Sequence, residues 1–344
     1  IEKYGADDSY PFSDLNDILP GLLEGKEKVY YTMGNQPGFD ERMVGWLNHL
    51  RNASRQGMQS PTEIVELDHV LNELRLFKSS AEIKAMRTAA DISVQAHIRA
   101  MQFTQPGKWE YQVEAEIIHE FMKNDCRSPA YPSIVGGGEN GCILHYIEND
   151  HRLKNNDLLL IDAGAEYDYY AADITRTFPI NGKFTTAQKA LYNLVLDAQK
   201  AAIAEVKPGN HWNQPHEAAV RVLTEGLLNL GLLKGKLETL IEKEQYRDFY
   251  MHRTGHWLGM DVHDVGDYKV GGEWRLLEPG MVLTVEPGLY VRDSNKIDKK
   301  WHFIGIRIED DVLVTKTGNE VLTDGAPKEV YEIEAIMAAA KSST

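Results

Sequence analysis

The sequence predicts an α/β (α+β) protein in which part of a small amino-terminal α/β domain precedes a larger, internally duplicated unit. Three observations support this fold class: helical and strand patterns alternate, one order of elements occurs twice, and the first residues resemble the middle of a domain. The chain has 344 residues, more than one hydrophobic core commonly serves. We therefore expect domains at 1–77 and 78–344.

The composition excludes several classes of protein. Hydrophobic residues at 42% and charged residues at 26% are typical of a folded globular chain. The net charge of -15 argues against nucleic acid or an anionic membrane as partner, because both require a basic surface. No apolar run reaches the roughly 18 residues of a membrane span. The only cysteines, Cys126 and Cys142, are too few for a disulfide framework, so we expect a cytoplasmic location.

The first region, up to residue 77, carries a short β pattern at 28–31 and then a helical pattern with Met43, Trp46 and Leu50. It contains no dense motif. The chain starts at Ile1 with neither a signal peptide nor an initiator methionine. We expect this domain to be incomplete.

The duplication appears first in the helices. Each copy has a helix, a Pro-Gly turn closely followed by tryptophan, and a second helix. In the first copy a capping box at 79–82 (SSAE) opens the first helix, and 106–109 (PGKW) follows it. In the second copy the corresponding segments are 185–188 (TTAQ) and 208–212 (PGNHW).

The strands that follow carry acidic residues in matching positions. Each copy has one carboxylate where an apolar strand meets a turn, and another on a partner strand further along. These are Asp162 after 158–161 and Asp173 within 172–176 in the first copy, and Glu286 after 281–285 and Glu309 within 306–310 in the second. In the run 309–311 (EDD), we expect one of Asp310 and Asp311 to be a solvated strand end.

Four carboxylates at the ends of apolar strands predict a metal centre. Burying one ionised carboxylate without compensation costs several kcal/mol, and two divalent cations would neutralise four. Any one of these acids alone is equally consistent with a solvated strand end. His256 is the fifth candidate ligand, in a segment at 252–263 that holds three histidines. The segment is not the HExxH motif of zinc proteases, because Arg253 stands where glutamate belongs.

An oxygen-rich ligand set favours hard cations. We therefore expect two divalent metal ions, Mn²⁺ first and Co²⁺ or Zn²⁺ as alternatives. Two such ions about 3.5 to 4 Å apart support the hydrolysis of a polarised carbonyl compound.

Five segments resemble the pita-bread metallopeptidases, and most closely the X-Pro aminopeptidase (aminopeptidase P) family. They are 141–149 (GCILHYIEN), 161–179 (IDAGAEYDYYAADITRTFP), 252–266 (HRTGHWLGMDVHDVG), 277–290 (LEPGMVLTVEPGLY) and 305–315 (GIRIEDDVLVT). The resemblance implies a pita-bread fold for 78–344 and the removal of the first residue from peptides with proline in second position. It also implies a homo-oligomer, either a dimer or a tetramer.

The resemblance also implies roles for individual residues. The metal ligands would be Asp162 on one ion, His256 on the other, Asp173 and Glu309 as bridges, and Glu286 completing the set. The residues that contact the substrate or the developing tetrahedral intermediate would be His145, His252 and His263, with Arg307 orienting carboxylates and Arg55 near the substrate entrance.

Three other functions share parts of this pattern. A prolidase, which cleaves only dipeptides, would use the same ligands, and a methionine aminopeptidase is usually shorter. A non-catalytic binding protein on this fold would be expected to lack ligands, and none is missing. The incomplete first domain leaves the oligomeric state and the preferred peptide length open. Arg253 departs from the small residue that the family often has there.

Overall fold

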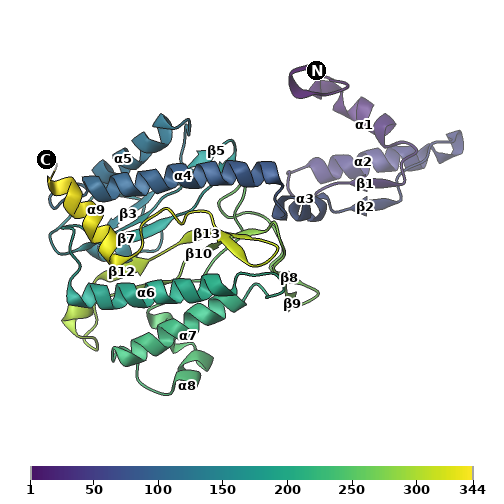
Figure 1. Cartoon of the computed structure of the whole chain (residues 1–344). Coiled ribbons are helices and arrows are strands. Elements are labelled where there is room, and N and C mark those ends of the chain that lie inside the picture. Colours follow the sequence, from purple (N-terminus) through teal and green to yellow (C-terminus); the bar gives the residue numbers. More distant parts are fainter. Residues whose placement is uncertain (1, 343–344) are drawn as a thin grey trace. The chain divides into compact units, whose positions relative to one another are not determined.

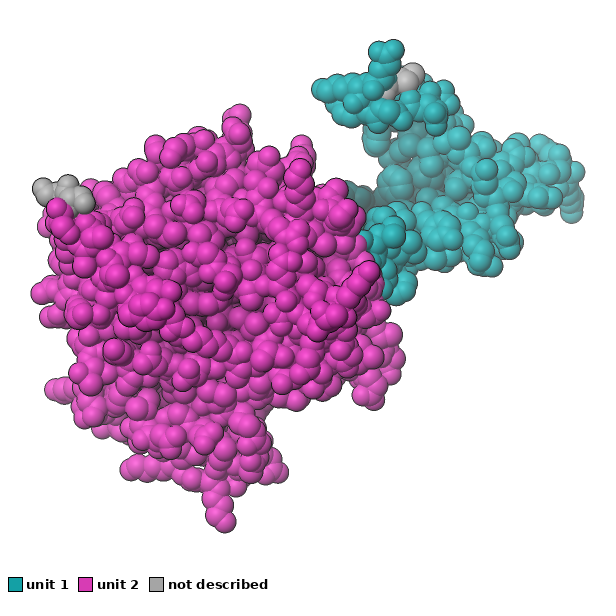
Figure 2. Space-filling view, viewed as in Figure 1, with its two compact units in different colours: residues 1–74 teal, residues 75–344 magenta. Residues whose placement is uncertain are grey.

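The computed structural model describes residues 2–342, and its chain separates into two compact units, 1–74 and 75–344 (Figure 2). Each unit has its own hydrophobic core. The separation falls near the end of helix α3 (Leu67–Leu76).

Unit 1 is a small α/β structure. Strands β1 (Lys28–Tyr30) and β2 (Glu63–Val65) pair in parallel, as a crossover through a helix requires. Its other elements are α1 (Leu15–Leu23), α2 (Phe39–Asn52), most of α3, and three short 3₁₀ helices, η1 (Glu2–Tyr4), η2 (Phe12–Asp14) and η3 (Ser54–Gln56). The core consists of Leu23 and the buried face of α2, with Met43, Trp46, Leu47 and Leu50.

Unit 2 contains two helix pairs, and each leads into β structure. The first pair is α4 (Ser80–Phe103) and α5 (Glu110–Lys123); the second is α6 (Thr186–Glu205) and α7 (Gln214–Asn229). The predicted capping boxes are confirmed, because the Ser79 and Thr185 side chains each accept a hydrogen bond from the third residue of their helix.

The strands form small antiparallel sheets. The first copy contributes β3 (Ile134–Gly137), β4 (Leu158–Asp162) and β7 (Thr175–Pro179), in the order β3-β4-β7. The second contributes β10 (Val282–Val285), β13 (Asp310–Val314) and β14 (Asn319–Val321), in that order, and the pair β11 (Gly288–Val291) and β12 (Ile304–Arg307). Asp162 faces Thr175 across one ladder, and Val285 faces Asp310 across the other. In Figure 1 the strands β3, β7, β10, β12 and β13 lie between α4 and α6.

Shorter elements complete unit 2. They are the hairpins β5 (Glu166–Tyr167) with β6 (Tyr170–Ala171) and β8 (Lys269–Val270) with β9 (Glu273–Trp274), and the helices η4 (Gly138–Cys142), α8 (Leu237–Glu242), η5 (Gln245–Asp248), η6 (Lys299–Trp301) and α9 (Val330–Ser342). In residues 2–342, no helix is both long enough and apolar enough to cross a membrane.

The prediction of strands running through 172–176 and 306–310 is wrong at Asp173 and Glu309. Strand β7 begins only at Thr175, and the second segment breaks between β12 and β13 at Glu309. The backbone amides of these acids bond across the two copies: Asp173 N to Asp311 Oδ2 at 3.0 Å, and Glu309 N to the Thr175 carbonyl at 3.1 Å. Both acids thus lie in irregular backbone where the copies meet.

Candidate metal centre

A cavity of about 210 Å³ opens in unit 2 where the strands of the two copies meet. Residues far apart in the sequence line it together. They include all five predicted ligands (Asp162, Asp173, His256, Glu286 and Glu309), the three predicted histidines (His145, His252 and His263) and Arg307.

The strands explain how acidic side chains come to be buried here. The apolar residues of β4 and β10 are nearly inaccessible on both faces, and this burial fixes the position of whatever residue ends each strand. Asp162 is the last residue of β4, and Glu286 directly follows β10. The apolar strands therefore carry polar side chains to the wall of the cavity.

Three of the candidate ligands are close enough to share one cation. One ligand atom each of Asp173, His256 and Glu309 lies within 4.8 Å of the others. The Nε2 atom of His256 is 3.4 Å from Asp173 Oδ2 and 3.7 Å from Glu286 Oε1. Asp162 joins this group through Tyr131, whose hydroxyl lies 2.7 Å from Asp162 Oδ1 and 2.5 Å from Asp173 Oδ1.

His256 is oriented by its backbone surroundings. Its Nδ1 atom lies 2.9 Å from the Trp257 carbonyl, which can only accept a hydrogen bond. Nδ1 therefore carries a proton, and Nε2 faces the carboxylates. Burial opposes the charged imidazolium, but the hydrogen bond to Asp173 and the charge of Glu286 outweigh it and raise the pKa of His256 to about 9.

The carboxylates repel one another. Burial, and then the charge of Asp162, raise the pKa of Asp173. Burial raises the pKa of Glu286 to about 7, against the opposing charges of His256 and Arg307. Burial and the charge of Asp173 raise the pKa of Glu309 well above its ordinary value. The raised pKa values show that ionising all of these acids together is unfavourable in the protein alone, and a bound cation would stabilise their ionised forms.

Arg307 supports the acids from behind. Its guanidinium donates to Asp162 Oδ2 at 2.6 Å, to the Tyr290 hydroxyl at 2.9 Å and to Thr175 Oγ1 at 3.0 Å. The Thr175 hydroxyl in turn donates to Glu309 Oε2 at 2.6 Å. One arginine thus orients two of the four carboxylates, one directly and one through a hydroxyl group.

The three predicted histidines have different surroundings. His252 Nε2 is 2.9 Å from the Tyr290 hydroxyl, and burial followed by the charge of Arg307 lowers its pKa to about 3. The ring of His263 stands edge-on to that of His256 at 4.3 Å, and burial lowers its pKa. His145 is exposed at the rim of the cavity, on the segment after η4.

Of two further expectations from the sequence, the one about Arg55 stays a prediction and the one about Asp310 and Asp311 is wrong. Arg55 lies exposed on η3 in unit 1, and its place near the substrate entrance stays a prediction. The expectation that Asp310 or Asp311 is a solvated strand end is wrong, because their exposed fractions are 0% and 1%. Asp310 forms an ion pair with Arg176, and Asp311 accepts the Asp173 amide, so both are structural.

Sequence reasoning missed the hydroxyl groups of the site. Tyr131, Thr175 and Tyr290 all contact predicted site residues. A strand position two residues from an acid was the available signal for Thr175, which follows Asp173 at that spacing. No such spacing points to Tyr131. It lies 31 residues before Asp162 in the sequence, and the two side chains meet only in the folded chain.

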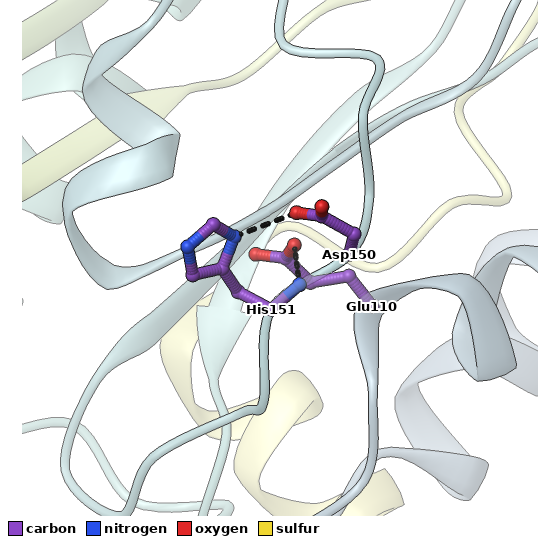
Figure 3. A group of neighbouring side chains, drawn as sticks. All are labelled: Glu110, Asp150 and His151. Carbon is purple, nitrogen blue, oxygen red and sulfur yellow. Dashed lines mark hydrogen bonds and ion pairs between the residues drawn. The ribbon is translucent and has the colours of Figure 1, made fainter.

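A second group, Glu110, Asp150 and His151, also has ligand-type atoms close together (Figure 3). In it, Glu110 is buried, whereas Asp150 and His151 are exposed and lie 2.8 Å apart as a pair. Both oxygens of Glu110 already accept hydrogen bonds from protein donors. The carboxylate of Glu110 is thus satisfied by donors of the protein, whereas the carboxylates of the metal cavity face one another.

The five predicted ligands of the cavity fit divalent cations, since four carboxylates lie there beside the Nε2 atom of His256. Their donor atoms are mostly oxygen.

Comparisons with known proteins agree with this site. The sequence signature of metallopeptidase family M24 matches residues 84–316. The Xaa-Pro aminopeptidase of Escherichia coli (strain K12) is 47% identical over 340 residues, which cover 99% of this chain and 77% of that protein. The structure of Pseudomonas aeruginosa aminopeptidase PepP is 60% identical with a TM-score of 0.95, over 99% of this chain and 77% of that one. Proline aminopeptidase P II from Yersinia pestis is 48% identical with a TM-score of 0.92, over 98% of this chain and 78% of that one.

The signature covers both copies of the duplicated unit and therefore every acid of the cavity. The predicted fold and family are confirmed: the chain belongs to metallopeptidase family M24 and has its pita-bread fold.

Proposed function

We propose that this chain is an Xaa-Pro aminopeptidase, a metal-dependent hydrolase that releases the first residue of peptides with proline in second position. One observation carries the proposal: a chain 47% identical to an Xaa-Pro aminopeptidase over nearly its whole length brings five candidate metal ligands into one cavity. The binding-protein alternative predicted missing ligands, and the cavity contains all five.

The proposed centre holds two divalent ions, and Mn²⁺ is the metal we expect. Asp162 and His256 would each bind a different ion, Asp173 and Glu309 would bridge them, and Glu286 would complete the set. The spacing of Asp173, His256 and Glu309 supports this assignment. When bound, such ions polarise a carbonyl group and lower the pKa of water.

The protein's own groups hold and orient the peptide in this proposal. His145, His252 and His263 line the cavity beside the acids, where they can hydrogen-bond to the peptide and to the oxygen that gains charge during hydrolysis. Arg307 keeps Asp162 in place. An Xaa-Pro bond has no N–H, so recognition of proline depends on the shape of the cavity.

Other parts of the proposal extend beyond this centre. Residues 1–77 would be the later part of the family's amino-terminal domain, and Arg55 would lie near the substrate. The active form would be a homo-oligomer in the cytoplasm. The free, buried cysteines Cys126 and Cys142 are compatible with a reducing compartment.

A substrate comparison tests the activity. The purified protein is stripped of metal, reloaded with Mn²⁺, and incubated with Arg-Pro-Pro, Gly-Pro and Met-Ala. We expect rapid release of arginine from Arg-Pro-Pro and little cleavage of Met-Ala. Cleavage of Gly-Pro alone would identify a prolidase instead, and the absence of both cleavage and stoichiometric metal binding would refute the proposal.

Two alanine variants test the assignment of bridges. We expect Asp173→Ala to lose far more activity than His252→Ala, because a bridge holds both ions whereas His252 contacts Tyr290 and Arg253. Metal content by atomic emission separates lost binding from lost chemistry. Equal residual rates would contradict the bridging role.

A further inference from the structure

His145 lies on a segment with little regular structure. Helix η4 ends at Cys142 and β4 begins at Leu158, and residues 143–151, all of them described, belong to no helix or strand. Such a segment has no ladder of backbone hydrogen bonds to hold it. A histidine that acts on a substrate nevertheless needs a fixed position.

One buried carboxylate joins this segment to the residues just before it. Glu110, the first residue of α5, has an exposed fraction of 0%. Its Oε1 atom accepts the Gly137 amide at 2.7 Å and Asn140 Nδ2 at 3.0 Å. Its Oε2 atom accepts the Tyr146 hydroxyl at 2.7 Å. The same atom accepts the His151 amide at 2.9 Å (Figure 3).

Only an ionised carboxylate suits these four donors. A carboxylate accepts at both oxygens, whereas the amide of glutamine accepts at one and donates at the other. Hydrogen bonds to a charged acceptor are also stronger than neutral ones. Glu110 stands at the amino terminus of α5, where the helix dipole favours a negative charge.

Tyr146 connects this carboxylate to the cavity. It directly follows His145 in the chain, and its exposed fraction is 4%. Its ring belongs to the apolar cluster that includes Leu160 and Tyr290. Tyr290 in turn contacts His252 and Arg307 through its hydroxyl. Holding the Tyr146 hydroxyl therefore fixes the backbone beside His145 relative to the metal cavity.

We infer that Glu110 is a positioning residue, which holds His145 at the cavity by joining residues 137–151 at both ends. The inference rests on the proposed function, because it assumes that His145 contacts the peptide. It also explains the second group of ligand-type atoms: Glu110 holds this segment, and Asp150 and His151 are an exposed pair beside it.

A double-mutant cycle tests the inference on the Mn²⁺-loaded full chain. The variants are Glu110→Gln, His145→Ala and the combination, with kcat and KM measured on Arg-Pro-Pro. Because a displacement of about 1 Å can cost up to about 100-fold in rate, we expect Glu110→Gln to lower kcat by about 10- to 100-fold. In the His145→Ala background the same change should lower kcat less than about twofold.

Controls separate positioning from general damage. Glu116→Gln changes a carboxylate on the same helix that pairs with Arg99, and it should leave kcat unchanged. Tyr146→Phe removes one of the four donors and should give a smaller loss than Glu110→Gln. Metal content and Tm are recorded for every variant. If Glu110→Gln lowered kcat equally in both backgrounds, the inference would be overturned.

A measurement without substrate keeps this test apart from that of the proposed function. In hydrogen exchange, Glu110→Gln should lose protection in peptides that contain Gly137 and His151, while peptides from α6 stay unchanged. Unaltered protection at 137–151 would overturn the inference even if the enzyme were active. Selective loss of protection in a protein that cleaves no Xaa-Pro peptide would show that Glu110 holds residues 137–151, while the proposed function, and with it the role of His145, would be refuted.

Discussion

Glu309 and Asp310 are neighbours in the chain and both are buried, yet their electrostatic surroundings are opposite. Asp310 accepts hydrogen bonds from Arg176 at 2.7 Å and from Lys328 at 2.6 Å, so that despite burial its pKa lies below the ordinary value. Glu309 faces Asp173 and Glu286, and its pKa lies well above the ordinary value. One carboxylate is neutralised within the protein and the other is not.

The difference separates Asp310, whose charge the protein compensates, from Glu309, a proposed metal ligand whose charge the protein does not compensate. A buried charge must be compensated, and the chain supplies two cations to Asp310. Glu309, with an exposed fraction of 1%, receives a hydroxyl hydrogen bond from Thr175 and repulsion from neighbouring acids. A cation at the proposed centre would compensate the ionised form of Glu309.

The largest effect expected from this comparison is on activity. Removing an outer-shell partner of a metal typically costs about 10- to 100-fold, so Glu309→Gln, which changes a proposed ligand, should lower kcat/KM by more than about 100-fold. Asp310→Asn, measured on folded protein, should retain activity much better. Similar losses of kcat/KM in both variants would contradict the distinction.

Stability should show the reverse order. Asp310→Asn leaves the buried Arg176 and Lys328 without their carboxylate, so it should lower the free energy of unfolding by about 3 to 5 kcal/mol. Glu309→Gln should change the stability of the metal-free protein little, because the raised pKa of Glu309 already favours an uncharged side chain there. Denaturant unfolding in the presence of a chelator measures both, and a loss below about 1 kcal/mol for Asp310→Asn would refute its structural role.

In the metal-free protein, Glu286 and His256 should add stability as the pH falls from about 8 to about 5.5. Their folded-state pKa values of about 7 and about 9 lie above those of the unfolded chain, so at these two groups the folded state binds more protons in this range. The histidines His97, His216 and His252, whose pKa values burial lowers to about 4, 3 and 3, should oppose this gain. Because these groups oppose one another, the contribution of Glu286 is the difference between the wild type and Glu286→Gln, which should shift by roughly 1 to 2 kcal/mol in favour of the wild type as the pH falls over this range. Chemical unfolding at several pH values measures it.

The Mn²⁺-loaded protein is the control for this pH effect. Its stability should fall over the same range, because metal binding requires deprotonated ligands. Parallel pH profiles with and without metal would mean that these groups do not bind it.

The smallest expected effect on stability comes from replacing Lys328, the second basic residue that pairs with Asp310. Lys328→Met leaves Arg176 in place, so the expected loss in the free energy of unfolding is about 1 to 2 kcal/mol. Lys207→Met is a matched control at an exposed pair with Glu205, where the loss should be below about 0.5 kcal/mol. Equal losses in thermal or denaturant unfolding would show that burial of the Asp310 pair does not matter.

Local chemistry made much of this molecule predictable. The capping boxes before α4 and α6 are formed by residues three positions apart, so sequence spacing alone locates these helix starts. The apolar runs of β4 and β10 likewise indicate buried strands, and an acid at the end of each was visible as a candidate ligand. Resemblance to a family added the role of each acid.

The sequence by itself therefore determined the duplicated order of elements, the five candidate ligands and the family. The tertiary structure alone decided which acids are neutralised, because Arg176 and Lys328 reach Asp310 from distant segments. It also placed Glu309 in a break between strands and joined Glu110 to the segment of His145. These contacts depend on three-dimensional packing of residues more than a dozen positions apart, which neither periodicity nor residue spacing encodes.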